Sequence, residues 1–201
     1  MPDLETLTVY ATRAQDYAQR FGKAGDGPHM KAFLAEVPKG GRILDLGCGP
    51  GHAAASMKRA GFVVDALDAS PELASIAREQ HGIEVRIASF EALDDDALYD
   101  GIYANVSLLH APKPDMPGHL ARIARALKPN GVFHIGLKSG TGERRDSLGR
   151  FYAYYEAEEL TRLLSNAGLD VFSQSEGEEV GLDGAPAPWI ILMARAHDLS
   201  L

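Results

Sequence analysis

One stretch of the sequence decides the fold: Ile43-Leu44-Asp45-Leu46-Gly47-Cys48-Gly49-Pro50-Gly51. Its first four residues are apolar except for Asp45 and follow two glycines, a pattern that indicates a short buried strand of a parallel sheet. Three alternating glycines come next, and residues 53–58 then contain several good helix formers. Strand, glycine turn and helix in this order form the first half of a βαβ unit, so the stretch predicts an α/β fold with a parallel sheet.

The glycine turn also predicts a ligand site. Glycine adopts positive φ and leaves the main chain bare, and the following helix directs its free N–H groups to the same place. The glycines are spaced G-x-G-x-G, whereas a dinucleotide site needs G-x-G-x-x-G, and His52 stands where its third glycine would be. Asp45, two residues ahead of the turn, suits a ligand with a positive charge better than a pyrophosphate. The spacing therefore favours a cationic ligand over a nicotinamide dinucleotide.

A second acid follows the next predicted strand. Residues 62–67 read as a parallel strand that ends at Asp68, and Ser70-Pro71 then reads as the cap and first residue of a helix. In doubly wound folds an acid at this place binds a ribose diol, because a carboxylate accepts both hydroxyl hydrogens. Helix capping explains Ser70 without a ligand, but it does not explain Asp68. We therefore expect Asp68 to bind a ribose.

These motifs resemble one enzyme family. Residues 45–51 (DLGCGPG) resemble motif I of the class I S-adenosylmethionine-dependent methyltransferases, and residues 64–73 and 126–132 resemble the same family. Residues 107–112 (SLLHAP) are similar to small-molecule members and to tellurite-resistance methyltransferases. The resemblance implies a three-layer, doubly wound α/β fold with a mixed seven-stranded sheet, the class I methyltransferase-like Rossmann fold. It also implies a single domain, residues 1–201, with a helical lid segment at 1–38 and an α/β core at 39–201.

The resemblance further implies a cofactor and the residues that hold it. The cofactor would be S-adenosyl-L-methionine, its product S-adenosyl-L-homocysteine, and no metal is expected. The residues expected to bind the cofactor are Asp45, Gly47, Cys48, Gly49, Gly51, Asp68, Ala69, Ser70, Ser89, Phe90, Asn105, Val106, Leu109 and Tyr17. Within this set, Asp68 would bind the ribose, and Asp45 would support the methionine ammonium indirectly. Asn105, Val106 and Leu109 would border the methionine and methyl end.

Several of these positions leave alternatives open. Ser89 stands where related enzymes commonly have an aspartate that binds the adenine amine, so its own hydroxyl, a backbone carbonyl or Glu91 would have to take over. Phe90 is either a wall for the adenine ring or a core residue. Tyr10 and Tyr17, in the predicted lid, either line the site or pack on the core.

The methyl acceptor would lie beside the end of the strand predicted at 99–105. His110 is the candidate general base, since the pKa of histidine lies near the operating pH, and Tyr155 is expected to face the acceptor with it. The alternative for His110 is a structural histidine at a helix start that bonds a backbone carbonyl. Residues 105–108 read NVSL in place of the N-P-P-[YF] of amide- and adenine-methylating members, which argues against methylation of a base amine.

Residues 138–150 form the most distinctive predicted loop. Its basic residues are Lys138, Arg144, Arg145 and Arg150. Aromatic residues follow at 151–155, and cations with aromatic rings near a strand end would bind a small anionic or aromatic substrate. The alternative is a mobile, solvated loop whose arginines pair with surface acids, and the sequence leaves both open.

Periodicity places the remaining elements. Helices are expected at 3–21, 30–37, 120–127 and 156–167, and strands at 83–88, 99–105, 132–137, 169–176 and 188–196. The last two strands would form an antiparallel hairpin whose turn region holds Gly181, Gly184 and Pro186. Asp94-Asp95-Asp96 reads as a solvated helix start and not as a metal site.

Composition narrows the function classes. The chain has 201 residues and a formal net charge of -8, and it contains no run of lysine and arginine, which argues against broad binding to nucleic acid. It shows no signal-peptide pattern and no stretch of about 18 apolar residues, so we expect neither export nor a membrane span. The single Cys48 permits no internal disulfide and fits a cytoplasmic protein.

The sequence thus predicts a cytoplasmic S-adenosylmethionine-dependent methyltransferase that acts on a small molecule through an O, N or S nucleophile, as a monomer or homodimer. The alternatives are an RNA or tRNA methyltransferase, a non-catalytic S-adenosylmethionine-binding module, and a nicotinamide oxidoreductase. The net charge and the NVSL stretch disfavour the first, and the glycine spacing disfavours the last.

Overall fold

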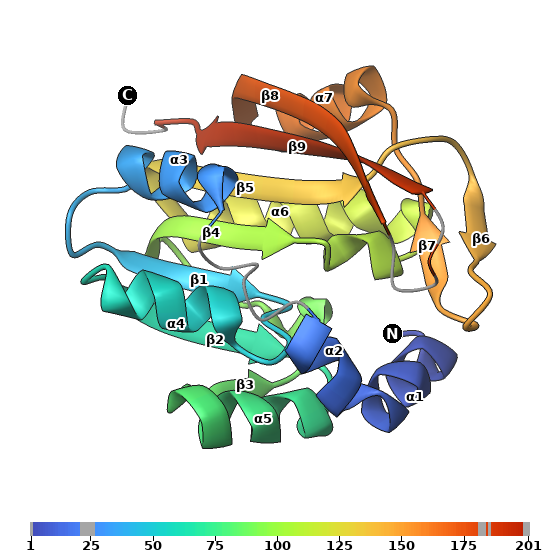
Figure 1. Cartoon of the computed structure of the whole chain (residues 1–201). Helices are drawn as coiled ribbons and strands as arrows, with labels where there is room; N and C mark the ends of the chain where they lie inside the picture. Colours follow the sequence, from blue (N-terminus) through green and yellow to red (C-terminus); the bar gives the residue numbers. More distant parts are fainter. Residues whose placement is uncertain (1, 21–26, 181–183, 185, 199–201) are drawn as a thin grey trace.

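The structure, a computed structural model, describes residues 2–20, 27–180, 184 and 186–198. Within these residues a seven-stranded sheet forms the centre of the molecule, with the strand order β3-β2-β1-β4-β5-β9-β8 (Figure 1). Its strands are β1 (Arg42–Leu46), β2 (Val63–Asp68), β3 (Val85–Ile87), β4 (Tyr99–Asn105), β5 (Leu127–Lys138), β8 (Leu169–Val180) and β9 (Pro186–Ala196). A separate two-stranded sheet pairs β6 (Glu143–Arg145) with β7 (Phe151–Ala153).

The pairing of the strands is mixed. β1 pairs in parallel with β2 and β4, β2 pairs in parallel with β3, and β4 pairs in parallel with β5. β9 pairs antiparallel with both β5 and β8. The predicted doubly wound fold with a mixed seven-stranded sheet is therefore confirmed, and so is the terminal antiparallel hairpin.

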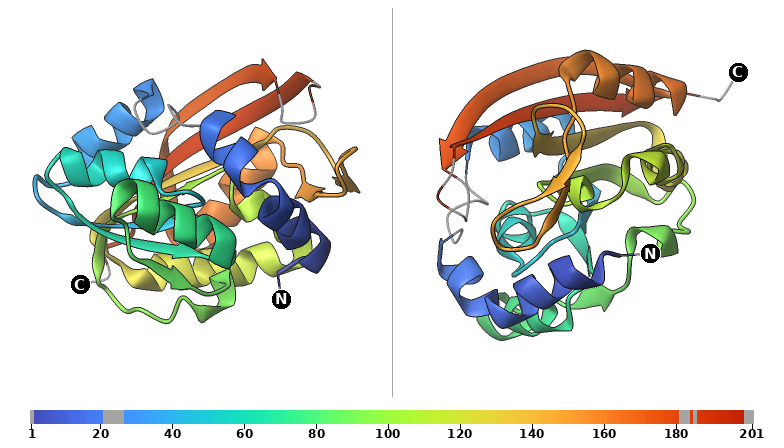
Figure 2. Two further views of the ribbon diagram at one scale, coloured as in Figure 1. Left: turned by 60° about the horizontal axis from the view of Figure 1, so that its bottom comes forward. Right: turned by 90° about the vertical axis from the view of Figure 1, so that its right-hand side faces the viewer.

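Helices cover both faces of the sheet (Figure 1, Figure 2). The helices on one face are α3 (Pro28–Glu36), α4 (His52–Arg59) and α5 (Pro71–His81), and those on the other are α6 (Met116–Ala126) and α7 (Ala157–Asn166). Helices α1 (Leu4–Thr12) and α2 (Ala14–Arg20) lie across the carboxyl ends of the parallel strands, at the same end of the molecule as the β6–β7 hairpin (Figure 1). Short 3-10 turns lie in the connections: η2 (Phe90–Ala92), η3 (Leu108–His110) and η4 (Lys113–Asp115).

Two apolar cores hold the layers together. Between the sheet and the α6–α7 layer, Ile102 of β4 packs in a cluster with Leu120 and Leu160, all fully buried. On the opposite face, Phe33 of α3 packs in a second cluster with Ile43 of β1. Burying one such side chain contributes roughly 1.5–3 kcal/mol, so both helical layers are fixed to the sheet mainly by apolar contact.

The N-terminal segment corrects one prediction. The helix expected at 3–21 is two helices with a break at Arg13, where the backbone leaves the helical region (φ -118, ψ 19). The break lets the helices face different partners. Ala14 of α2 packs against α5, whereas Thr6 of α1 is buried beside the β6–β7 hairpin. The expected helix end at Phe21 lies outside the described residues.

Two further predictions are wrong. The segment 138–150 is not an open loop, because β6 within it pairs with β7. No helix starts at residues 94–96, which are irregular; the buried Leu93 ends η2, and Asp95 forms an ion pair of 3.1 Å with Arg86. Across the described part of the chain, no group of side chains could hold a metal ion.

The boundaries of other elements differ from those expected. β5 begins at Leu127, before the predicted start at 132, and its pairing with β4 shifts register there, with Asn130 at φ 62. Gly181, expected in the turn of the terminal hairpin, lies outside the described residues. None of the helices in the described ranges combines the length and the apolar character that a membrane span requires.

The close packing of α3 on the sheet predicts that Gly101 cannot be enlarged. A Cβ atom at Gly101 in β4 would lie 2.9 Å from both Phe33 Cζ and Val37 Cγ2. We expect Gly101→Ala to lower the free energy of unfolding by about 1–3 kcal/mol, because overpacking a core forces side-chain and backbone shifts. Urea unfolding measures this loss.

The matched control is Gly118→Ala in α6. A Cβ atom there would have its nearest neighbour at 3.9 Å, at the flexible end of Arg122. Alanine should therefore leave the stability unchanged or raise it by up to about 1 kcal/mol through its higher helix propensity. A Gly101→Ala protein as stable as this control would contradict the packing described here.

Candidate functional site

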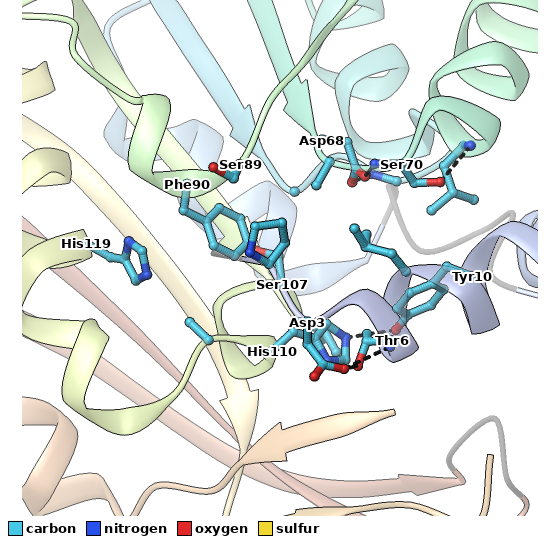
Figure 3. A pocket seen from close by; sticks show the side chains of 18 of the residues that line it. Asp3, Thr6, Tyr10, Asp68, Ser70, Ser89, Phe90, Ser107, His110 and His119 are labelled. Carbon is cyan, nitrogen blue, oxygen red and sulfur yellow. Dashed lines mark hydrogen bonds between the residues drawn. The ribbon is translucent and has the colours of Figure 1, made fainter. Parts of the chain in front are cut away.

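Two adjoining cavities open at the carboxyl ends of the parallel strands. The first, of about 810 Å³, lies between α1, the end of β2 and η2 (Figure 3). The second, of about 1020 Å³, lies between the glycine turn, the end of β4 and the β6–β7 hairpin. The residues that line both cavities are Tyr10, Tyr17, Gly47, Gly49 and Val106, so the cavities meet at the glycine turn.

The glycine turn is shaped by the loop that follows β4. Gly47 has φ 76, and a Cβ atom on it would overlap the Cβ atom of Ser107. The Ser107 hydroxyl donates a hydrogen bond of 2.7 Å to the Leu46 carbonyl and so ties the two loops together. Gly49 leaves bare main chain between the cavities. Gly51 lines neither cavity. A Cβ atom on Gly51 would lie 2.8 Å from the Ala77 side chain of α5, so this glycine allows α4 to pack closely on α5.

Asp68 ends β2 and lines the first cavity. Its two carboxylate oxygens accept hydrogen bonds of 2.8 Å from the backbone N–H groups of Gly49 and Ser70. Ser70 in turn caps α5 by accepting from the Leu73 N–H at 3.3 Å. Burial raises the pKa of Asp68, and the backbone hydrogen bonds oppose that rise. Each carboxylate oxygen keeps a further acceptor direction, so Asp68 can hold the glycine turn and still accept ligand hydroxyls.

Asp45 is the buried acid of the second cavity, with 3% of its surface exposed. Burial raises its pKa to about 7, partly opposed by a hydrogen bond from the Ala54 backbone. Its Oδ2 atom has no hydrogen-bond partner among the described residues. An unsatisfied buried oxygen costs free energy until a donor or a cation reaches it. The second cavity is therefore suited to a cationic or hydrogen-bond-donating group.

The end of β4 presents Asn105 and Val106 in a constrained geometry. Val106 has φ 57, a conformation that β-branched residues rarely adopt, and its N–H donates to the Gly136 carbonyl at 2.8 Å. A hydrogen bond of 3.2 Å joins Asn105 Oδ1 to Nε2 of the fully buried His134, which stacks on Tyr103. Strained residues of this kind concentrate at functional sites. Neighbouring β5 thus fixes the direction of the Asn105 side chain.

Phe90, Ser89 and His119 form the far wall of the first cavity (Figure 3). Phe90 lines the cavity and also packs against the main core, so both alternatives left by the sequence hold for it. His119 of α6 meets the Phe90 ring edge-on at 5.6 Å and is 4% exposed. Sequence reasoning missed His119, because nothing in its helical pattern separates it from a core residue.

His110 lies in η3 and lines the first cavity. Its Nδ1 is 2.7 Å from the Phe151 carbonyl oxygen, and its Nε2 is 2.9 Å from the Tyr10 hydroxyl. Because a carbonyl oxygen only accepts, Nδ1 carries the hydrogen and Nε2 accepts from Tyr10. Burial lowers the pKa of His110 to about 4, so the ring is neutral near pH 7. His110 therefore bonds a backbone carbonyl, as the structural alternative expected, and keeps an unprotonated nitrogen beside the cavity.

Arg150 supports the Tyr10 side of this arrangement. Its guanidinium forms an ion pair of 2.6 Å with Asp146, and the two side chains are 3% and 4% exposed. One of its terminal nitrogens also donates to the Tyr10 hydroxyl oxygen at 3.3 Å. Arg150 and Lys138 both line the second cavity. The sequence contained no pattern that pairs Arg150 with Asp146 or places either beside Tyr10.

The β6–β7 hairpin also binds helix α1. Arg145 forms an ion pair of 2.7 Å with Asp3, and the Phe151 N–H donates to the Thr6 hydroxyl at 2.8 Å. Arg145 of the segment 138–150 thus pairs with a partly exposed acid, as one alternative expected, whereas Arg150 pairs with the buried Asp146, which that alternative did not expect. The first and last residues of the segment line the second cavity.

Most of the expected site residues lie at the two cavities. Those on the first are Tyr17, Gly47, Gly49, Asp68, Ala69, Ser70, Ser89, Phe90, Val106 and His110, and the second adds Asp45, Cys48 and Asn105. Leu109 and Tyr155 line neither cavity and are fully buried in the main core. The Tyr155 ring lies under the ammonium group of Lys113, 4.5 Å away, so it does not face the expected acceptor position.

Comparison with known proteins places the chain in a family. A family model described as a methyltransferase domain matches residues 17–174. The chain belongs to this family. The resemblance to class I S-adenosylmethionine-dependent methyltransferases that the sequence showed is therefore confirmed.

The similar sequences and structures are consistent with this family. A ubiquinone biosynthesis O-methyltransferase of Xanthomonas oryzae pv. oryzae is 38% identical over 110 residues, which cover 51% of this chain and 45% of that protein. The chain thus matches less than half the length of this curated relative.

Solved structures agree on the fold. The Burkholderia thailandensis 1,6-didemethyltoxoflavin-N1-methyltransferase, with bound 1,6-didemethyltoxoflavin and S-adenosylhomocysteine, is 24% identical with a TM-score of 0.79 over 97% of this chain and 88% of that chain. A TehB-like S-adenosylmethionine-dependent methyltransferase of Corynebacterium glutamicum is 20% identical with a TM-score of 0.68 over 91% of this chain and 97% of that chain. At these identities the likeness shows the fold.

Asp45 predicts a pH-dependent stability. Its pKa in the folded protein is about 7, against 3.8 for an unperturbed aspartate. As the pH rises from about 4 to about 7, the unfolded chain releases this proton first, so folding becomes less favourable by up to about 4 kcal/mol above pH 7. We expect Asp45→Asn to gain stability relative to the wild type between about pH 5 and about pH 8, measured by urea unfolding.

Asp65→Asn is the control, since Asp65 lies on neighbouring β2 in a half-exposed ion pair with Arg42. The Asp65→Asn protein should not show this relative gain. A stability difference between Asp45→Asn and the wild type that stays constant over the same pH range would contradict the ionisation behaviour assigned to Asp45.

Proposed function

We propose that this protein transfers a methyl group from S-adenosylmethionine to a small-molecule acceptor. The observation that carries the proposal is the meeting of two cavities at the bare main chain of Gly47 and Gly49. The first cavity offers a carboxylate and an aromatic wall, and the second offers a buried acid with an unsatisfied oxygen. S-adenosylmethionine matches these features in order: its nucleoside suits the first cavity, its sulfonium the glycine turn, and its amino-acid end the second cavity.

The residues present fit this cofactor. Asp68 would accept the ribose hydroxyls, Phe90 would cover the adenine, and Asp45 would support the methionine ammonium. When bound, the cofactor supplies an electrophilic methyl group whose leaving group is a neutral thioether. The remaining tasks of the protein are to align the acceptor and, for a hydroxyl, to remove its proton.

The acceptor would lie beside the methyl group near Val106, where the two cavities meet, with His110 as the general base. The segment 1–38 would act as a lid on the core 39–201 of one domain. The contacts of α1 with the β6–β7 hairpin support this role, because they hold the helix over the first cavity.

Two observations favour a small acceptor over RNA. The net charge of -8 opposes broad binding to a phosphate backbone. The cavities are bracketed by α1 and the β6–β7 hairpin, which suits a molecule that fits inside them. The names of the similar proteins point the same way, to ubiquinone biosynthesis and to 1,6-didemethyltoxoflavin. We retain a cytoplasmic monomer or homodimer as part of this proposal.

Calorimetric titration with S-adenosylmethionine, S-adenosylhomocysteine and NAD tests the cofactor. We expect micromolar binding of the first two and none of NAD. Binding of NAD alone, or of none of the three, would overturn the proposal. Tight binding of S-adenosylmethionine without turnover of any acceptor in a broad panel would favour the non-catalytic binding module instead.

Asp68 provides the mutational test of the nucleoside site. Asp68→Asn keeps the size of the side chain and one acceptor oxygen but removes the charge that would bind the ribose. We expect the affinity for S-adenosylmethionine to fall by at least about 1.5 kcal/mol, roughly tenfold in Kd, in the same titration. Asp65→Asn, on the same strand but away from both cavities, should bind as the wild type does. Unchanged affinity in Asp68→Asn would remove Asp68 from the cofactor site.

A further inference from the structure

Tyr10, and not His110, reaches both cavities. Tyr10 lines the first and the second cavity, whereas His110 lines the first. The Tyr10 hydroxyl also occupies the unprotonated Nε2 atom of His110 at 2.9 Å (Figure 3). An acceptor that lies in the second cavity therefore meets the Tyr10 phenol before it can meet the histidine.

The hydrogen bonds around Tyr10 run in one direction. Arg150 donates to the Tyr10 oxygen at 3.3 Å, Tyr10 donates to His110 Nε2, and His110 Nδ1 donates to the Phe151 carbonyl at 2.7 Å. The tautomer of His110 is fixed by its carbonyl partner, so the direction of this chain is fixed as well. A proton that arrives at the Tyr10 oxygen can be passed on to His110 without any change in the position of a heavy atom.

Arg150 and Tyr152 partly offset the cost that burial places on a negative charge at the Tyr10 oxygen. Burial raises the pKa of Tyr10, but the charge of Arg150 and hydrogen bonds from Arg150 and Tyr152 lower it. The charged and titratable groups around His110 are Tyr10 of α1, Tyr152, Arg150 and Asp146 of the hairpin segment, and Lys138 of β5. Asp146 already accepts two hydrogen bonds from the Arg150 guanidinium, which keeps that guanidinium in place beside Tyr10.

The second cavity indicates the shape of the acceptor. Its aromatic lining residues are Tyr10, Tyr17, Tyr103 and Tyr152. The Lys138 ammonium lies 4.0 Å from the centre of the Tyr152 ring, and both residues line the cavity. Aromatic walls favour a planar ring, and nearby cations favour an oxygen that becomes negative. A neutral, buried imidazole is a weak base, which suits a hydroxyl that gives up its proton easily and not an aliphatic alcohol.

We infer, resting on the proposed function, that Tyr10 and His110 form a proton relay for an acceptor that carries an acidic hydroxyl on a planar ring, a phenol or an enol. The acceptor hydroxyl would lie beside the Tyr10 oxygen, which lines the second cavity. Tyr10 and His110 are then catalytic residues, and Arg150 is a positioning residue that acts through Tyr10.

The relay balances protons and electrons. The acceptor O–H proton moves to the Tyr10 oxygen as the Tyr10 proton moves to His110 Nε2. An oxygen lone pair of the acceptor forms the new O–CH₃ bond, and the electrons of the S–CH₃ bond of S-adenosylmethionine remain on sulfur. The positive charge of the sulfonium ends on the His110 imidazolium, which releases its proton to solvent after the products leave.

Two phenols of different acidity test the relay near pH 8. Catechol is largely protonated there and needs the relay, whereas 4-nitrophenol is largely ionised and does not. We expect Tyr10→Phe and His110→Gln each to lower kcat/KM for catechol by about 100-fold and for 4-nitrophenol by less than about threefold. Mass spectrometry of the methylated phenol and of S-adenosylhomocysteine measures the rates. A merely structural role of Tyr10 would lower both rates equally.

Tyr99→Phe is the matched control, because Tyr99 is a buried tyrosine at the amino end of β4 and lines neither cavity. It should leave both rates unchanged. If Tyr10→Phe lowered kcat/KM equally for the two phenols, or for neither, the relay would be overturned. If the Tyr10→Phe protein does not fold, the same comparison with His110→Gln gives the answer. Intact binding of S-adenosylmethionine with no turnover of either phenol would overturn the acceptor class. If the wild-type protein did not bind S-adenosylmethionine at all, the proposed function itself would be overturned.

Discussion

The contact between Gly47 and Ser107 is the constraint on which the site depends. It joins the loops that follow β1 and β4, two neighbouring strands from which the chain continues to opposite sides of the sheet. In open α/β sheets the crevice at such a reversal is where ligands bind. Any side chain on Gly47 would push the loops apart, and the two cavities would lose their common wall. The same contact brings Val106 and the bare glycine turn to one place.

Helix α1, which lies over the first cavity, is held by polar contacts and by the packing of Tyr10 on a small apolar cluster of α2 and α5. Thr6 is the buried residue of α1, and Leu4 on the same helix is 77% exposed. The helix is attached mainly through Asp3, Thr6 and Tyr10, which bond Arg145, the Phe151 backbone and His110 respectively. Net contributions of such bonds are about 0.5–1.5 kcal/mol each, far less than those of a packed apolar face.

The sequence predicted the parts of the fold and the site that depend only on residues close together in the chain. The strand before Gly47, the turn itself, and Asp68 with the Ser70 cap each follow from neighbours a few residues away. The break at Arg13 could not be predicted, since it depends on two different partners of the N-terminal helices. The hairpin of β6 and β7 was missed because three-residue strands with mixed polarity carry no periodic signal.

Contacts between distant segments set the rest of the site. Tyr10 and His110 are 100 positions apart, and only the folded chain shows that one occupies the basic nitrogen of the other. The placement of Tyr155 failed for a related reason. Its neighbours Phe151 and Tyr152 belong to the hairpin that faces the cavities, and a residue just beyond a short strand can point to either side. Its ring turned to the core, under Lys113.

Three unfavourable features of the described residues lie at the two cavities. Asp45 holds an unsatisfied oxygen, Val106 adopts a left-handed backbone, and Arg150 and Asp146 form a buried ion pair. Each costs free energy in the folded protein, and a buried ion pair in particular is weak evidence for stability. These three costs therefore arise where a ligand can offset them. A cation or a hydrogen-bond donor beside Asp45 would satisfy the carboxylate oxygen that folding leaves without a partner.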